Sequence, residues 1–465
     1  MKKIEKKVVP NETNAWEALD KQAHESAIIF AEKYKYFISK CKTEREVVNY
    51  LLKELEKEGF RPLEEIEEAI IGTKFYASTR GKILAIGVIG KKKVFEGVRI
   101  LAAHLDAPRI DLKADPLYED SGLALFKTHY YGGIKKYQWT TIPLALHGIV
   151  MLADGSKIEL VIGEDAKDPI FTITDLLPHL AQEQMKLSLK EGIKGEELNL
   201  LVGSLPMEVK KDEKEKVKAA IFDYLKINYK ITKADFISAE LEIVPAGEAR
   251  DVGFDRALIA GYGQDDRICV YATVRALLEA KQHDYTNIVY LTDKEEIGST
   301  GDTGACSRYL EFVLASLCEL QGETSAAAVL RTTYRSKALS ADVSAGFDPT
   351  FPNVHEKQNA AIINQGVVVE KYTGHGGKYE ANDASAEYIG YVRDIFARAG
   401  ICWQTGELGK VDLGGGGTVA MYLSNLGIET VDCGPAMLSM HAPQEISSKA
   451  DLYWTYLAYK AFLEN

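Results

Sequence analysis

Residues 98–106 carry the clearest structural signal in the chain, the stretch VRILAAHLD. A buried strand is predicted over Val98–His104, because residue 98 and residues 100–103 are apolar, and the polar residues His104 and Asp106 stand at the end of that strand. In open α/β sheets, ligands and catalytic groups gather at the carboxyl ends of the strands. The stretch therefore predicts an α/β fold with a functional site at the tip of this strand.

Strand and helix patterns alternate on both sides of this stretch. Apolar residues recur at helical spacing from Trp16 to Gly59, and strands are predicted over Lys74–Ser78 and Ile83–Ile89. The alternation returns after Leu241, with a helix after Asp266 and a strand over 288–292. The sequence therefore predicts a mixed sheet covered by helices.

The segment between these two parts has a different pattern of residues. Short aromatic-rich and alternating pieces with turn signals such as Gly132-Gly133 fill residues 107–241. We expect a strand-rich domain inserted at this place, while 1–106 and 242–465 together form one larger, catalytic domain.

The composition excludes several classes of protein. The chain has 465 residues, 68 acidic against 56 basic, and a formal charge of -12, which disfavours nucleic acid or an anionic membrane as a partner. The six cysteines are scattered without a CxxC pair, the start lacks the apolar core of a secretory signal, and no run is apolar enough to span a membrane. We expect a cytoplasmic protein.

Acidic residues and histidines stand at predicted strand ends or in adjoining loops at five places: His104 and Asp106, Asp265-Asp266, Glu295-Glu296, Asp342, and His441. Each place alone is more often a surface ion pair or a helix start. Together, carboxylates at neighbouring tips repel one another, and a bound cation is the simplest way to keep them ionised. Two histidines and three carboxylates would hold two divalent ions, and zinc accepts such nitrogen and oxygen ligands. A two-metal site polarises a carbonyl and activates a water molecule.

At this point the chain resembles a known family, the aspartyl aminopeptidases and vacuolar aminopeptidases, which are co-catalytic zinc exopeptidases. The resemblance spans nearly the whole chain, and its motifs come in the family's order. The matching motifs are AHLDAP at 103–108, GQDDR at 263–267, DKEEIGS at 293–299, SAD at 340–342 and SMH at 439–441.

The resemblance implies a role for each residue in these motifs. It implies a zinc-exopeptidase-like fold and two divalent ions per subunit, zinc in the first place, with cobalt and manganese as alternatives. Asp106 would orient His104, and Glu295 would be the general base that takes a proton from water. Asp265 would bridge the two ions, since the family's pattern puts the bridging aspartate first in the pair. The implied terminal ligands are His104, Glu296, Asp342 and His441.

The resemblance also implies an assembly. The family carries a dimerisation domain between the first histidine ligand and the bridging aspartate, where residues 107–241 lie. Within it, Leu177-Pro178-His179-Leu180-Ala181 is similar to the motif whose histidine reaches the neighbouring subunit's active site. His179 is thus implied to bind the tetrahedral intermediate across the interface. Family members form dodecamers built from dimers, so we expect a homo-oligomer.

The substrate preference stays open between two residues. Acid-preferring relatives carry a lysine soon after a Gly-x-Val pattern, whereas here Gly366-Val-Val-Val369 is followed by Glu370 and then Lys371. Neighbours in a strand point to opposite faces, so only one of them can line the pocket. Glu370 there would favour neutral or basic N-terminal residues, and Lys371 would favour acidic ones.

The sequence thus predicts a metal-dependent aminopeptidase that hydrolyses the N-terminal residue from peptides. Neither HExxH nor GxSxG occurs, which disfavours a zincin or a serine hydrolase. The glycine run 414–417 lacks a phosphate-binding frame and is interpreted as a tight strand-to-helix turn. Two alternatives are a two-metal amidohydrolase acting on N-acyl amino acids and a non-catalytic, self-assembling shell.

Overall fold

The computed structural model describes residues 13–208, 215–281, 283–325 and 327–465. Residues 1–10, and residues 212–214 of the charged stretch 212–226 whose sequence predicts a helix, lie outside the described residues. The chain divides into two compact units: a larger one of Met1–Asp106, Ala249–Met440 and Gln444–Asn465, and a smaller one of Ala107–Glu248 and His441–Pro443.

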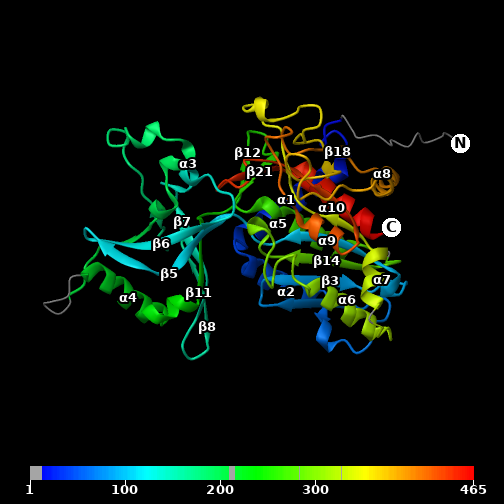
Figure 1. Ribbon diagram of the computed structural model, residues 1–465, viewed down its shortest axis with the longest axis horizontal. Helices are drawn as coiled ribbons and strands as arrows, with labels where there is room; N and C mark the ends of the chain where they lie inside the picture. Colours follow the sequence, from blue (N-terminus) through cyan, green and yellow to red (C-terminus); the bar gives the residue numbers. More distant parts are fainter. Residues whose placement is uncertain (1–12, 209–214, 282, 326) are drawn as a thin grey trace. The chain divides into compact units, whose positions relative to one another are not determined.

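A nine-stranded mixed sheet forms the centre of the larger unit (Figure 1). The four central strands β14, β4, β15 and β19 run parallel, and the sheet turns antiparallel on both sides, at β3 and at β17. In sheet order the strands are β1 (Arg61–Pro62), β2 (Lys74–Thr79), β3 (Ile83–Val88), β14 (Thr286–Thr292), β4 (Val98–His104), β15 (Lys337–Ser340), β19 (Glu429–Gly434), β17 (Val367–Glu370) and β18 (Trp403–Thr405).

Helices cover both faces of this sheet because its strands are apolar on both sides. Alternate residues of β4 face opposite cores: Leu101 and Ala103 belong to one apolar cluster, Ile100 and Ala102 to the other. The first cluster is completed by α1 (Lys21–Lys40), α2 (Glu44–Lys57), α5 (Gln264–Glu279), α8 (Ala386–Ala399) and α10 (Lys449–Leu463). The second is completed by α6 (Tyr309–Leu320), α7 (Ala328–Arg335) and α9 (Val419–Asn425).

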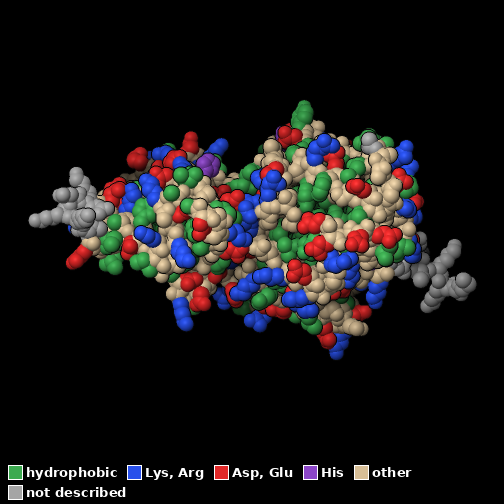
Figure 2. All heavy atoms as spheres, turned by 90° about the horizontal axis from the view of Figure 1, so that it is seen from below, with side chains coloured by type: hydrophobic (Ala, Val, Ile, Leu, Met, Phe, Trp, Pro, Cys, Tyr) green, Lys and Arg blue, Asp and Glu red, His purple; other side chains and the backbone are tan. Residues whose placement is uncertain are grey.

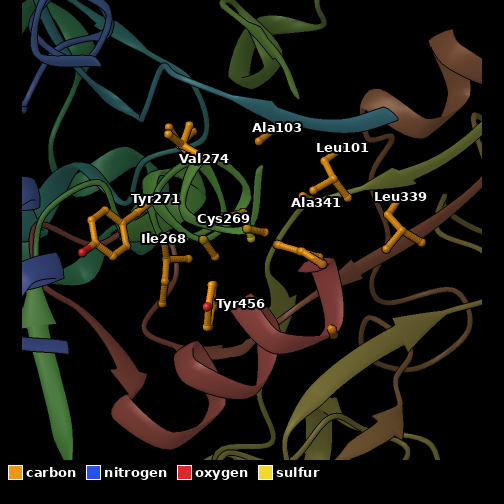
Figure 3. Packing of buried hydrophobic residues seen from close by; sticks show 14 of the residues in the cluster. Leu101, Ala103, Ile268, Cys269, Tyr271, Val274, Leu339, Ala341 and Tyr456 are labelled. Atoms are coloured by element: carbon orange, nitrogen blue, oxygen red, sulfur yellow. The ribbon is translucent and has the colours of Figure 1, made fainter. Parts of the chain in front are cut away.

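Figure 3 shows part of the first cluster, between the sheet and the helices α5 and α10. Leu101 on β4 and Leu339 on β15 pack with Ile268, Cys269 and Tyr456 from the two helices. Burial of side chains of this size stabilises the fold by about 1.5–3 kcal/mol each. This packing anchors α5, whose first residues belong to the candidate site.

A smaller sheet of the larger unit consists of β12 (Arg250–Val252), β13 (Leu258–Gly261), β21 (Glu445–Ser448), β20 (Ala436–Leu438) and β16 (Ser344–Ala345), in that order. The fold is thus α/β with a mixed, helix-covered sheet, as predicted.

The predicted helical region 16–59 consists of two helices, because Thr43 begins a new one. The Thr43 side chain accepts the N–H of Glu46, and the Glu46 side chain accepts the N–H of Thr43.

The smaller unit is a seven-stranded antiparallel sheet. Its strands, in sheet order, are β8 (Lys157–Ile162), β7 (Leu144–Met151), β11 (Ala239–Pro245), β5 (Arg109–Asp120), β6 (Leu123–Tyr131), β10 (Leu200–Gly203) and β9 (Thr172–Ile173). Its helices are α3 (Leu189–Gly192) and α4 (Lys216–Tyr229). The unit extends to Glu248 because β11 pairs with β7 along its whole length, beyond the predicted end at residue 241.

The surface carries charges of both signs. Figure 2 shows acidic and basic side chains intermixed over the face that it displays. Among the residues that the structure describes, none of the helices has the length and the apolar character that a membrane crossing needs.

Candidate metal centre

The predicted site residues gather where three parallel strands end. His104, the last residue of β4, lies opposite Thr292 at the end of β14, and Ala102 lies opposite Ser340 at the end of β15. Because parallel strands end at the same edge of a sheet, the residues that follow them come together. These residues are Asp106 after β4, Glu295 and Glu296 after β14, and Asp342 after β15.

The His104 ring is buried and held in one orientation. Its Nδ1 lies 3.1 Å from the carbonyl oxygen of Asp106 and 3.3 Å from a carboxylate oxygen of the same residue. Both neighbours can only accept from the ring, so Nδ1 carries a proton, and Nε2 is the ring nitrogen through which His104 could bind a metal ion. Nε2 lies 3.2 Å from Asp265 Oδ1 and 4.0 Å from both Glu295 Oε2 and Asp342 Oδ1. A metal-binding nitrogen thus faces three carboxylates.

Asp265 and Asp266 take different positions at the start of α5. Both have non-helical backbone angles, and the peptide bond between them is cis. The Asp265 carboxylate faces His104 Nε2, whereas Asp266 is fully buried and its Oδ2 accepts the backbone N–H of His104 at 3.2 Å. Of the two, Asp265 is the one whose carboxylate faces His104 Nε2.

The turn with Glu295 and Glu296 is tied to Asp106. The two Asp106 carboxylate oxygens accept the backbone N–H groups of Glu295 and Glu296 at 3.1 and 3.2 Å. The two glutamates begin a short 3-10 turn, Glu295–Ile297. Asp106 thereby orients the His104 ring and this turn at once.

The donor set fits a divalent cation. One ligand atom from each of His104, Glu295 and Glu296 lies within 4.8 Å of the others, and the same holds for His104, Asp265 and Asp342. Imidazole nitrogen with carboxylate oxygen is a zinc-type set of ligands.

The pKa shifts of two residues in the cluster also favour a bound cation. Burial, with the nearby Asp266, raises the pKa of Asp342 well above its ordinary value. Burial by itself would lower the pKa of His104, but hydrogen bonds to Asp106 and Asp265 raise it. Without a metal, Asp342 thus favours its neutral, protonated form and His104 its positively charged form. Both changes reduce the negative charge at this place, and a bound cation would have the same effect.

His441 lies in the segment His441–Pro443, which is grouped with the smaller unit. Within that unit its Nδ1 lies 3.1 Å from the carbonyl oxygen of Gly133. A carbonyl only accepts, so Nδ1 carries the proton, and Nε2 is the nitrogen through which this ring could bind a metal. A Cβ at position 133 would lie 3.3 Å from the ring, which explains a glycine there. Its role as a ligand stays a prediction.

The remaining predicted residues lie in two other places. His179 is exposed in a turn of the smaller unit, neither in a helix nor in a core. Glu370, the last residue of β17, is buried, and its carboxylate is hydrogen bonded to the Ser344 hydroxyl, two residues beyond Asp342. Lys371 is exposed, with its Nζ 2.6 Å from Asp383 Oδ1.

Two residues that support the site were not predicted from the sequence. Glu445 Oε2 accepts the backbone N–H of Asp265 at 3.1 Å, and Gln264 Nε2 donates to the Glu445 carbonyl at 2.6 Å. Together they fix the backbone just before α5. The position of Gln264 beside Asp265 is a signal that could have identified it, whereas no local pattern marks Glu445.

The chain is similar to known proteins along nearly its whole length. Residues 37–463 match the family model described as aminopeptidase I zinc metalloprotease (M18). A probable M18 family aminopeptidase 1 of Clostridium acetobutylicum is 50% identical over 456 residues, covering 97% of this chain and 98% of that protein.

Solved structures share the fold. The crystal structure of an M18 family aminopeptidase from Thermotoga maritima matches with a TM-score of 0.94 at 44% identity, over 98% of this chain and 99% of that one. The S. cerevisiae mApe1 dodecamer matches with a TM-score of 0.75 at 22% identity, over 95% of this chain and 98% of that one, which shows the fold alone. The chain therefore belongs to the aminopeptidase I (M18) family of zinc metalloproteases, and its activity is that of an aminopeptidase.

Proposed function

We propose that the cluster holds two divalent ions, zinc in the first place, and that its residues divide the work as the family resemblance implies. Asp265 would be shared between the ions, and His104, Glu296, Asp342 and His441 would be the terminal ligands. The observation that supports the proposal is the position of His104 Nε2, which lies within 4.0 Å of carboxylate oxygens from three separate segments, those of Asp265, Glu295 and Asp342. When bound, the ions polarise the scissile carbonyl and acidify water.

Glu295 is the group that moves the proton. Its side chain is 15% exposed and its Oε2 lies 4.0 Å from His104 Nε2, so it stands at the rim of the cluster with access to solvent. A carboxylate in this position takes a proton from the attacking water and passes it to the amine that leaves. Its backbone hydrogen bond to Asp106 keeps it in place during both transfers.

The reaction is removal of an N-terminal residue with a free amine, and not hydrolysis of N-acyl amino acids. The experiment compares aminoacyl p-nitroanilides with their N-acetylated forms, before and after dialysis against EDTA. We expect hydrolysis of the free-amine substrates alone, lost with the metal and restored by added zinc. Activity that persists in metal-free protein, or equal rates on the acetylated substrates, would contradict the proposal.

We infer from the placement of Glu370 that the side-chain pocket favours neutral or basic N-terminal residues. The buried Glu370 is bound to Ser344, close in sequence to the ligand Asp342, while Lys371 is engaged with Asp383 at the surface. A carboxylate that lines the pocket repels, in its ionised form, an acidic substrate side chain and attracts a basic one.

A homo-oligomer built from dimers, with a dodecamer as the complete assembly, is also part of the proposal. The turn that carries His179 presents three leucines, Leu176, Leu177 and Leu180, each more than half exposed. Clustered apolar side chains of this kind are typical of a protein interface. His179 would then reach the active site of the neighbouring subunit and hold the tetrahedral intermediate.

The partners are therefore peptides and further copies of this chain. Each of the six cysteines lies outside any disulfide, which supports a reducing compartment such as the cytoplasm.

A further inference from the structure

The loop between Asp293 and Gly304 carries both glutamates of the candidate centre. Strand β14 ends at Thr292, and the loop is closed by a backbone hydrogen bond from the N–H of Asp293 to the carbonyl of Thr303 at 3.0 Å. Asp293 and Thr303 are each 1% exposed, although the loop between them reaches the surface. The buried ends thus face each other beneath the turn that begins with Glu295.

Three side chains connect these ends. Lys294 Nζ lies 3.0 Å from Asp293 Oδ2 and 2.5 Å from Thr303 Oγ1, and the Thr303 hydroxyl donates to Asp293 Oδ2 at 2.8 Å. Each of the three atoms contacts the other two. We call Asp293, Lys294 and Thr303 the loop triad.

The backbone of Lys294 makes its identity notable. Its φ of 68° lies in the left-handed region, where asparagine and glycine are more comfortable than lysine. The turn is held in this form by a hydrogen bond from the Ser299 N–H to the Lys294 carbonyl at 2.7 Å. Backbone preference therefore does not explain a lysine here, and the contacts of its ammonium group do.

The path of the lysine side chain depends on a glycine. A Cβ at Gly301 would lie 3.1 Å from Lys294 Cδ, and the φ of Gly301 is +123°. The side chain thus crosses the loop over Gly301 to reach Thr303. The glycine at position 301 thus leaves room for the lysine side chain.

The glutamate turn is consequently held from two sides. Asp106 accepts the backbone N–H groups of Glu295 and Glu296, and Lys294, the residue immediately before Glu295, is fixed through its side chain. A carboxylate that transfers protons loses efficiency when it is displaced by a fraction of an ångström to an ångström. We propose that Lys294, acting with Asp293 and Thr303, is a positioning residue that sets the Glu295 carboxylate for proton transfer. The inference rests on the proposed role of Glu295.

The test uses substitutions at Thr303 that separate its hydroxyl from its shape. Thr303→Val keeps the volume and removes the hydroxyl, whereas Thr303→Ser keeps the hydroxyl. On zinc-saturated full-length protein, with the best substrate of an aminoacyl p-nitroanilide panel, we expect Thr303→Val to lower kcat about tenfold and to leave KM within about twofold. Thr303→Ser should retain kcat within about twofold of the unsubstituted protein.

A second variant checks the lysine itself. Lys294→Gly removes the ammonium group and relaxes the left-handed backbone, so it should reproduce the loss of kcat without a lower melting temperature. The matched control is Thr300→Val in the same loop, because Thr300 is exposed and its hydroxyl lies outside the triad. Its kcat should not change.

Three results would contradict the inference about the loop triad. Full kcat in both Thr303→Val and Lys294→Gly would overturn the inference, and so would equal losses in Thr303→Val and Thr303→Ser, which would indicate packing. A loss of kcat that follows lost zinc and is reversed by excess zinc would overturn it as well. The role of Glu295 is tested separately by Glu295→Gln, whose retained activity would remove the proposed function whatever the triad variants do.

Discussion

Asp106 Oδ1 accepts the backbone N–H of Glu295 at 3.1 Å, which joins the end of β4 to the turn that follows β14. The same carboxylate contacts His104 Nδ1 at 3.3 Å and the N–H of Glu296 at 3.2 Å. Asp106 therefore orients one proposed ligand through its ring and a second through its backbone. In the proposed function it connects these two segments without being a ligand itself.

We predict that Asp106→Ala weakens zinc binding by about 10- to 100-fold, because the Glu295–Glu296 turn loses both of its acceptors and the His104 ring keeps only the backbone carbonyl of residue 106. Asp106→Asn keeps one acceptor oxygen and should lie between the alanine variant and the unsubstituted protein. Competition against a chromogenic chelator measures the affinity. Zinc affinity within twofold in Asp106→Ala would show that the ligands are held by other contacts.

Glu370 should make stability depend on pH. Burial raises its pKa from 4.5 to about 7, so the folded state keeps its proton where the unfolded chain has lost it. The folded protein is therefore favoured by this group below pH 4.5, and the advantage is lost as the pH rises to about 7, a change of about 3 kcal/mol. Glu370→Gln should raise the melting temperature at pH 8 and leave it unchanged at pH 4.5. An equal effect at both values would refute this account.

The same residue should set substrate preference. We predict that the unsubstituted protein hydrolyses Arg, Lys and Leu p-nitroanilides faster than the Asp and Glu ones, and that Glu370→Gln selectively lowers kcat/KM for Arg and Lys. Lys371→Ala, which alters the neighbouring exposed residue, is the control and should leave the order unchanged. A strong preference for Asp in the unsubstituted protein would assign the pocket to Lys371 instead.

His179 should act in trans. His179→Ala and Glu295→Gln should each be inactive alone, since one lacks the partner's contribution and the other lacks the base. When the two are unfolded and refolded together, mixed dimers contain one complete site, and up to about a quarter of full activity should return. No recovery, with mixed dimers verified by native mass spectrometry, would place the action of His179 elsewhere.

The strands and their polar ends were predictable because their signals are local. The run from Val98 to His104 forms β4 with the predicted bounds, since apolar residues on both faces suit a strand buried on both sides. The choice of Asp265 over Asp266 came from the family pattern, and the backbone at the start of α5 aims Asp265 toward His104.

The supporting contacts were not predictable, because they join distant segments. Glu445 meets Asp265 across 180 residues of chain, and no pattern at either place announces the contact. In the same way, β11 continues to Pro245 by pairing with β7, whereas the sequence pattern changes at residue 241.

The glycine run also differs from its interpretation as a tight turn. It belongs to a loop of thirteen residues, 406–418, between β18 and α9. The carbonyl of Gly416 accepts the N–H of Gly374 at 2.7 Å, and a Cβ at Gly415 would lie 1.9 Å from the Gly374 carbonyl oxygen. The glycines thus allow two loops to approach each other, which local sequence does not reveal.

The central claim is that Glu295 moves the proton at a metal centre that Glu296 helps to build. The most direct measurement is kcat of Glu295→Gln at full zinc occupancy, with Glu296→Gln as the companion variant. We predict that Glu295→Gln binds zinc like the unsubstituted protein and loses about 10²- to 10⁴-fold in kcat, while Glu296→Gln loses zinc. Near-normal kcat in zinc-loaded Glu295→Gln would contradict the account.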